Sequence, residues 1–285
     1  MICDETVVPP TDFSIRKHYS ENLIYMPHCY FVNSHEYLSP SKDLDQLSRA
    51  TYGLPEQGFI FCCHSRPDKI DPITFRSWLR VLKSVRQVGA QENLSEQANT
   101  VLWLLRSGDE MEHNLRILAW EELGLDYNAL IFAEKAPRDE HLRRLKLADL
   151  FLDTPAYNAH TVGVDCLSAG VPMVSLLRDA PLQFNLEGGI ETEKLASRVG
   201  ASLLKSIGMD DLIAPTMKEY EAIMTRCATD SEWFSQTKER LKSSRVYSPL
   251  FDTKRWVSNL ETALREITSP SNQAKKRYDV FVIDR

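Results

Sequence analysis

Short apolar runs alternate with longer amphipathic segments between Gly58 and Leu177. Each run is too short for a helix, and unbroken apolar runs of this length are typical of parallel strands buried on both faces. The pattern therefore predicts five strands, at 59–63, 101–105, 129–132, 150–152 and 173–177.

The segments between these strands have helical periodicity. The clearest one follows Asp71, a candidate N-cap, and starts with Pro72 at the first helical position. Its apolar residues recur at helical spacing as far as Val85, which indicates one buried face. Because parallel strands joined by helices need crossover connections, the sequence predicts an α/β, Rossmann-like fold with a doubly wound parallel sheet.

Outside this region the pattern changes at both ends. Residues 1–50 are interrupted by prolines and are typical of a connector, so we expect the main lobe to span 51–267. After Gly208 the strand pattern stops and the sequence predicts an all-helical extension. Its helices have candidate N-caps at Thr216, Asp230 and Asp252. Residues 268–285 are polar and predict a loosely held tail.

The stretch 147–177 carries the strongest signal for a ligand site. A strand at 150–152 is followed by a loop of small residues and by a helix at 160–169, with Asn158 as the expected N-cap and Gly170 as its end. The loop leaves the carboxyl end of the strand, where open α/β sheets bind ligands.

The start of this helix predicts the kind of ligand. Backbone N–H groups in its first turn, from His160 and Thr161 onward, favour an anion such as a diphosphate. Gly163 would let a bulky group approach the backbone, and Asp165 could accept hydrogen bonds from sugar hydroxyls. The alternative is that Thr161 and Asp165 only cap and decorate a surface helix.

Two basic clusters follow other predicted strands. Lys69 ends the first, 64–69, and could reach a diphosphate as a point charge, although a solvated loop lysine is the simpler interpretation. In the second cluster the basic residues recur every three positions and so share a helix face. These residues are Arg138, His141 and Arg144.

Composition excludes several classes of protein. A net charge of −6 argues against nucleic-acid binding, and no apolar run approaches the length of a membrane span. The acidic amino terminus lacks a signal core, and six scattered cysteines predict reduced thiols rather than disulfides or a zinc site. Asp43 and Asp45 match a metal-binding D-x-D pattern, but their polar surroundings indicate a solvated helix and no metal.

Several motifs, in this order, resemble those of the protein O-GlcNAc transferase family. They are YSENLIYMPH (19–28), YGLPE (52–56), KIDP (69–72), VLWLLR (101–106), HLRRLKLAD (141–149), LADLFLDTPAYNAHTVGVDCLSAGVPMVS (147–175), LASRV (195–199) and SPLFDTKRW (248–256). The resemblance implies the carboxyl-terminal catalytic lobe of a GT-B fold and the segment leading into it. The family's tetratricopeptide repeats and amino-terminal lobe have no counterpart in this sequence.

The resemblance also assigns roles to residues. Lys69 corresponds to the family's essential donor-phosphate lysine, and Arg66 stands where the family has a glutamine that touches the diphosphate. The implied nucleotide contacts are the backbone of Ala136 and Arg138 at the uracil, and His141 and Arg144 at the base and ribose. The implied diphosphate and ribose contacts are His160, Thr161 and Asp165, while Val162 replaces a second threonine.

By resemblance the activity is an inverting, metal-free transfer of GlcNAc from UDP-GlcNAc to serine or threonine hydroxyls of proteins, in the cytoplasm or nucleus. No cofactor beyond this donor substrate is implied. Two alternative functions remain: a nucleotide-sugar-binding module without the acceptor lobe, and a protein O-fucosyltransferase that uses GDP-fucose. Residues 176–194 form a longer stretch than the family has, and predict either a neutral insertion or a lid over the donor.

Overall fold

The computed structural model describes residues 1–35, 47–178, 194–269 and 278–284. Its main feature is a six-stranded parallel sheet with the order β5-β4-β3-β6-β7-β8. The strands are β3 (Ile60–Cys63), β4 (Val101–Leu105), β5 (Leu130–Ala133), β6 (Leu150–Leu152), β7 (Met173–Leu176) and β8 (Ile213–Ala214). The expected doubly wound parallel sheet is therefore confirmed.

The order of the strands reverses between β3 and β6. From β3 the chain winds outward through β4 to β5, then crosses back to β6 and winds the other way to β7 and β8. Phe61 in β3 pairs with Leu102 on one side and with Leu150 on the other, so β3 is central. In open α/β sheets such a switch point leaves a crevice at the carboxyl ends of the two strands.

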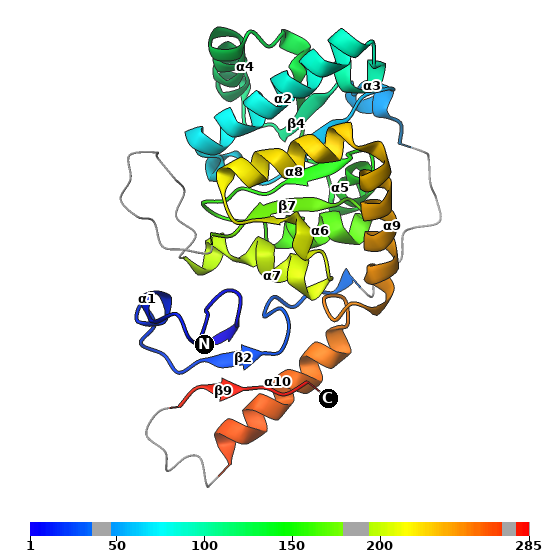
Figure 1. Cartoon of the computed structure of the whole chain (residues 1–285). Coiled ribbons are helices and arrows are strands. Elements are labelled where there is room, and N and C mark those ends of the chain that lie inside the picture. Colours follow the sequence, from blue (N-terminus) through cyan, green and yellow to red (C-terminus); the bar gives the residue numbers. More distant parts are fainter. Residues whose placement is uncertain (36–46, 179–193, 270–277, 285) are drawn as a thin grey trace.

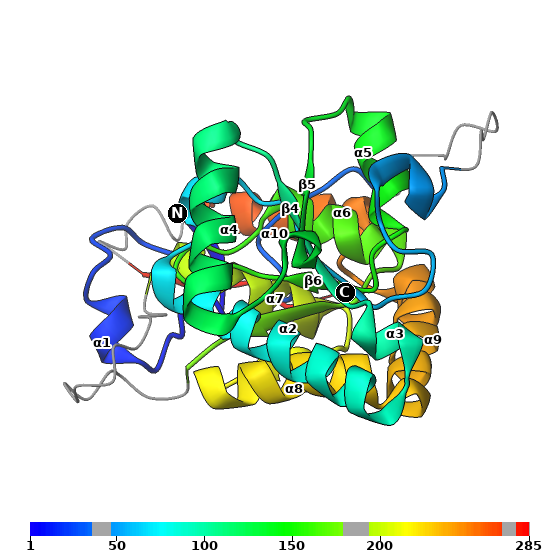
Figure 2. The same cartoon turned by 90° about the horizontal axis from the view of Figure 1, so that it is seen from above.

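Helices cover both faces of the sheet, which explains why its strands are uninterrupted apolar runs. Helices α2 (Pro72–Glu92) and α8 (Met217–Thr229) lie on one face, while α5 (Arg138–Leu145) and α6 (Thr161–Ala169) lie on the other (Figure 2). The indole N–H of Trp78 in α2 donates to the hydroxyl of Tyr220 in α8 at 3.1 Å, which ties the first pair together. The further helices are α3 (Ser95–Ala98), α4 (Asp109–Leu123), α7 (Val199–Ser206), α9 (Ser231–Tyr247) and α10 (Thr253–Thr268).

A second, smaller parallel sheet lies below the main one in Figure 1. It has the order β1-β2-β9, from β1 (Ile2–Asp4), β2 (Ile24–Met26) and β9 (Val280–Phe281), and packs against α10. A short helix, α1 (Phe13–Arg16), connects β1 to β2. The two ends of the chain thus meet in one unit, in which Arg16 pairs with Asp279 at 3.0 Å.

The structure corrects two expectations about the carboxyl-terminal part. The region after Gly208 is not wholly helical, because β8 pairs with β7 and β9 pairs with β2. The tail is also not loosely held over 278–284, since Val280 donates its N–H to Leu23 O at 2.8 Å. Both strands have only two residues, too few for an alternation to show in the sequence.

Local signals predicted the ends of helices more accurately than they predicted these two short strands. Asp71, Thr216, Asp230 and Asp252 all accept backbone N–H bonds at helix starts, and Gly170 ends α6 in the left-handed region. Helix α2 continues to Glu92, past the predicted apolar face, and ends at Asn93, with φ of 56°. β5 begins one residue later than expected, because Ala129 belongs to a 3-10 turn capped by Asp126.

Candidate active site

The loops that follow β3 and β6 meet at the switch point of the sheet. Lys69 ends a 3-10 turn (Pro67–Lys69) after β3, and its Nζ donates to the carbonyl oxygen of Asn158 at 3.0 Å. The same ammonium lies 4.1 Å from the ring centroid of Tyr157, a cation–π distance. Burial lowers the pKa of Lys69, and the carboxyl group of Asp153 opposes that shift. Lys69 therefore faces the loop after β6.

Asp153 organises the loop after β6. Its carboxylate is buried and accepts the N–H groups of Thr154 at 2.9 Å and Ala159 at 2.7 Å, and the Ser175 hydroxyl at 2.6 Å. Burial raises the pKa of Asp153 to about 7, against the lowering effect of these hydrogen bonds. A Cβ on Gly200 of α7 would lie 2.1 Å from an Asp153 oxygen, so only glycine allows this approach.

The start of α6 differs from the sequence prediction in its capping residue. His160, rather than Asn158, stands at the N-cap, and its Nδ1 lies 2.9 Å from the Asn158 carbonyl oxygen. Asn158 instead connects elements: its Nδ2 donates to Thr154 O at 3.1 Å, and its Oδ1 accepts the Gly200 N–H at 2.9 Å. Thr161 is exposed at the first helical position, where the first backbone N–H groups of a helix have no acceptor within the helix.

Gly163 has a different role from the one expected. A Cβ at this position would lie 3.1 Å from Leu203 and 3.3 Å from Met173, both buried in the core. The residue is small because α6 packs closely against α7 and β7.

Asp165 forms the charged centre of the site. The residue is 2% exposed, and its Oδ1 lies 2.6 Å from His35 Nε2 and 3.1 Å from Arg138 Nη2. Its Oδ2 lies 3.6 Å from His141 Nε2. Burial by itself raises the pKa of this carboxyl group, but hydrogen bonds with His141 and His35 and the charge of Arg138 outweigh burial and hold the pKa at about 2. Asp165 is therefore a structural ion-pair centre as well as a candidate for hydroxyl binding.

Sequence reasoning missed His35. Its side chain is 3% exposed, and its Nδ1 lies 3.1 Å from Asn33 Oδ1. That amide is fixed in orientation, because its Nδ2 donates to Leu250 O at 2.6 Å. His35 lies in the expected connector, 130 residues from Asp165, and no local motif marks it. Only the folded arrangement connects the two.

The other residues predicted for the site differ in burial and in whether they contact Asp165. Arg138 and His141 of α5 both reach Asp165, as their shared helix face predicted. Arg144 lies deeper, is buried, and donates to Glu134 O at 2.6 Å. Arg66 is exposed and paired with Asp68. Ala136 lies in the loop between β5 and α5.

A buried histidine next to the site, His64, was also not predicted from the sequence. His64 and Ser65, directly after β3, are buried, and among the described residues neither ring nitrogen of His64 has a hydrogen-bond partner. The His64 ring lies 4.4 Å from Trp103 and 6.0 Å from His141, measured between ring centroids. Burial, then Arg144 and His141, lower the pKa of His64 well below its usual value, so its ring is neutral.

Some expectations lie outside what the structure describes. Asp43 and Asp45 fall there, as do residues 179–193 of the longer stretch, so neither the D-x-D pattern nor the lid is tested. Over the described ranges, no group of three or more potential ligands is placed to hold a metal ion. No helix in those ranges is both long and apolar enough to cross a membrane. All six cysteines are free and buried, as predicted.

The fold and the edge where Lys69 faces the start of α6 define the class: a doubly wound lobe of the GT-B type. The chain belongs to glycosyl transferase family 41, whose model matches residues 39–260.

The chain is 39% identical over 266 residues to a probable UDP-N-acetylglucosamine--peptide N-acetylglucosaminyltransferase of Arabidopsis thaliana, covering 92% of this chain and 24% of that relative. It is 35% identical over 232 residues to a UDP-N-acetylglucosamine--peptide N-acetylglucosaminyltransferase of Caenorhabditis elegans, covering 81% of this chain and 17% of that relative. The chain thus spans about a quarter or less of these relatives. An O-GlcNAc transferase of Thermobaculum terrenum has a TM-score of 0.72 at 22% identity, covering 95% of this chain and 45% of that one.

Proposed function

We propose that this chain is the donor-binding lobe of a protein O-GlcNAc transferase. It would bind UDP-GlcNAc and, with an amino-terminal lobe, transfer GlcNAc to serine or threonine hydroxyls of proteins with inversion and without a metal. The observation that carries the proposal is the meeting of Lys69 and the α6 start at the switch point, with Asp165 beside them. The printed names of the two relatives support this choice of donor.

In this proposal the nucleotide lies along the amino-terminal half of α5. The backbone of Ala136 and the side chain of Arg138 hold the uracil, and His141 and Arg144 support the base and ribose. Asp165 accepts the ribose hydroxyls. Arg138 is 45% exposed at its side chain and can turn from Asp165 to the base, while His35 keeps its contact with the carboxylate.

Catalysis follows from charge on the leaving group. As the bond between sugar and phosphate oxygen breaks, negative charge grows on UDP, and Lys69 and the N–H donors of His160 and Thr161 would stabilise it. One fixed donor of this kind is worth about 3 kcal/mol of barrier. Arg66 reaches the diphosphate only after it leaves Asp68, and both side chains are exposed enough to permit this.

The acceptor side comes from elsewhere in this proposal. The chain spans about a quarter of its relatives, and a lobe with tetratricopeptide repeats would precede it in the complete enzyme. The small sheet β1-β2-β9 is the natural place for that lobe to join, because β1 and β9 each have one unpaired edge among the described strands. The buried reduced cysteines support a cytoplasmic or nuclear location.

Calorimetric titration with UDP, GDP and UDP-GlcNAc tests this assignment. We expect UDP and UDP-GlcNAc to bind and GDP to bind at least tenfold more weakly. Preference for GDP would favour the O-fucosyltransferase alternative, and binding of none of the three would refute the donor site. UDP-GlcNAc binding without transfer, in the presence of the amino-terminal lobe, would instead indicate a binding module.

A further inference from the structure

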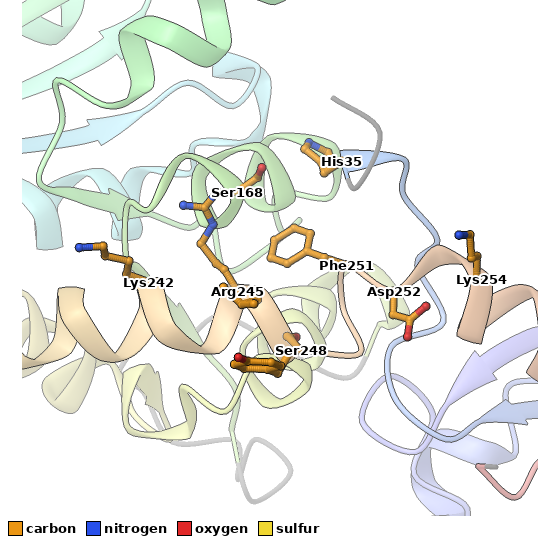
Figure 3. Close-up of a pocket in the computed structure, with 10 residues that line it drawn as sticks. His35, Ser168, Lys242, Arg245, Ser248, Phe251, Asp252 and Lys254 are labelled. Carbon is orange, nitrogen blue, oxygen red and sulfur yellow. The ribbon is translucent and has the colours of Figure 1, made fainter. Parts of the chain in front are cut away.

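A cavity outside the donor edge lies where the end of α9 meets α6 and the segment before α10. Its volume is about 780 Å³, within the usual range for small-molecule sites. Arg245 lies at its centre, with its guanidinium directed toward Ser168 of α6 and the ring of Phe251 beside it (Figure 3). Lys242 and Lys254 lie on opposite sides of this pair.

Arg245 is the unusual member of this group. Its side chain is half-buried, and in the described part of the chain no carboxylate pairs with it and no oxygen accepts from it. Burial, with no compensating charge, lowers the pKa of its guanidinium. A half-buried guanidinium that faces a cavity and has no counter-ion among the described residues leaves a position for an anion.

The charges around the cavity indicate how many negative charges the anion carries. Three cations and one carboxylate, Asp252, are among its lining residues, which leaves two net positive charges. Lys242 also contacts Glu239 at 3.5 Å, but both side chains are largely exposed, so this pair is weak and Lys242 can exchange it for a bound anion. The carboxylate is already engaged, because Asp252 Oδ1 caps α10 by accepting the Arg255 N–H at 2.9 Å. A dianion therefore balances the site better than a carboxylate or sulfate ester, and a guanidinium binds phosphate oxygens in a bidentate manner.

Apolar groups at the rim indicate that the ligand has an apolar body. Val246 and Tyr247 line the opening and expose 72% and 87% of their surfaces, and the Phe251 ring forms part of the wall. His35 also lines the cavity and bonds Asp165 through its Nε2, so a ligand here would lie one side chain away from the donor edge. We propose that this cavity binds a small organic phosphate monoester, with the phosphate on Arg245 and the organic group against Phe251.

Three probes of matched shape test the proposal on the full 285-residue chain, by calorimetry at constant ionic strength and neutral pH. Phenyl phosphate carries both the dianion and the ring, phenyl sulfate has the same shape with one charge, and inorganic phosphate lacks the ring. We expect phenyl phosphate to bind most tightly. Equal affinity for phenyl phosphate and phenyl sulfate, or binding of neither, would overturn the proposal.

Variants locate the bound probe. Arg245→Gln should weaken phenyl phosphate roughly tenfold, the usual effect of losing a charged hydrogen-bond donor. Arg265→Gln makes the same charge change at an exposed ion pair on α10 with Glu261 and should leave binding unchanged. If Arg245→Gln lowers the melting temperature, the exposed Lys254→Gln provides the same test without a buried change.

The donor site needs a separate control, because it too is proposed to bind phosphates. Lys69→Ala should leave phenyl phosphate affinity unchanged while it weakens UDP. If Lys69→Ala abolishes phenyl phosphate binding, or if the Arg245 and Arg265 variants lose affinity equally, the cavity is not the site. The proposed function survives either of those results, since it rests on UDP binding alone.

Discussion

Replacement of Asp165 by asparagine should destabilise the folded protein by about 2 kcal/mol near neutral pH. The carboxylate holds His35, Arg138 and His141 together from three parts of the chain. Its pKa is held at about 2, against an ordinary value of 3.8. At about 1.4 kcal/mol for each tenfold change in an equilibrium constant, this corresponds to about 2.4 kcal/mol of stabilisation by the charged form.

The pH dependence follows from the direction of that shift. Because the folded pKa lies below the unfolded one, the stabilisation is fully present above pH 3.8 and is lost as the pH falls through about 2. Urea unfolding of the wild type and of Asp165→Asn at several pH values measures the difference. It should be about 2 kcal/mol at pH 7 and should shrink below pH 3.8.

Asp211→Asn is the matched control. It removes a carboxylate that also pairs with an arginine, Arg240, but on the surface, and such exposed pairs contribute about 1 kcal/mol or less. An Asp165→Asn protein as stable at pH 7 as the wild type, or no more destabilised than Asp211→Asn, would refute the interpretation of Asp165 as a buried ion-pair centre.

Three further predictions concern the site. Lys69→Ala should abolish transfer by the complete enzyme, because its charge is proposed to stabilise the leaving group, yet leave the melting temperature nearly unchanged; retained turnover would remove Lys69 from catalysis. Asp165→Ala should weaken UDP more than inorganic diphosphate in calorimetric titrations, since its proposed partner is the ribose; equal losses would contradict that role. Gly200→Ala should lower the unfolding free energy in urea by about 1–3 kcal/mol, because its Cβ would overlap Asp153; an unchanged midpoint would show that α7 can shift.

The described residues around Lys69 show how far the sequence could predict the candidate site. A lysine after a strand and a helix start after another strand were visible as local patterns, and the fold brings them together at a carbonyl oxygen of Asn158. The exchange of capping roles between Asn158 and His160 was not visible. Asn158 is held by Gly200, 42 residues away, and this tertiary contact outweighed the local preference for asparagine at an N-cap.

The sequence by itself determined several elements of the main sheet and its helices. Buried parallel strands must be continuously apolar, and helix ends need side chains or glycine to satisfy free backbone groups, so β4, β6, the start of α2 and the end of α6 could be predicted from local patterns. These effects act within one turn or one strand, a range that a sequence pattern records.

Only the tertiary structure decided which distant residues meet. The two-residue strands β8 and β9 are extended because a neighbouring strand supplies their hydrogen bonds, and Gly163 is small because α7 and β7 pack against it. His35 and Asp165 are 130 residues apart, and their 2.6 Å contact exists because two buried polar groups must find partners in the folded core. Such requirements arise between segments, and no pattern along either segment contains them.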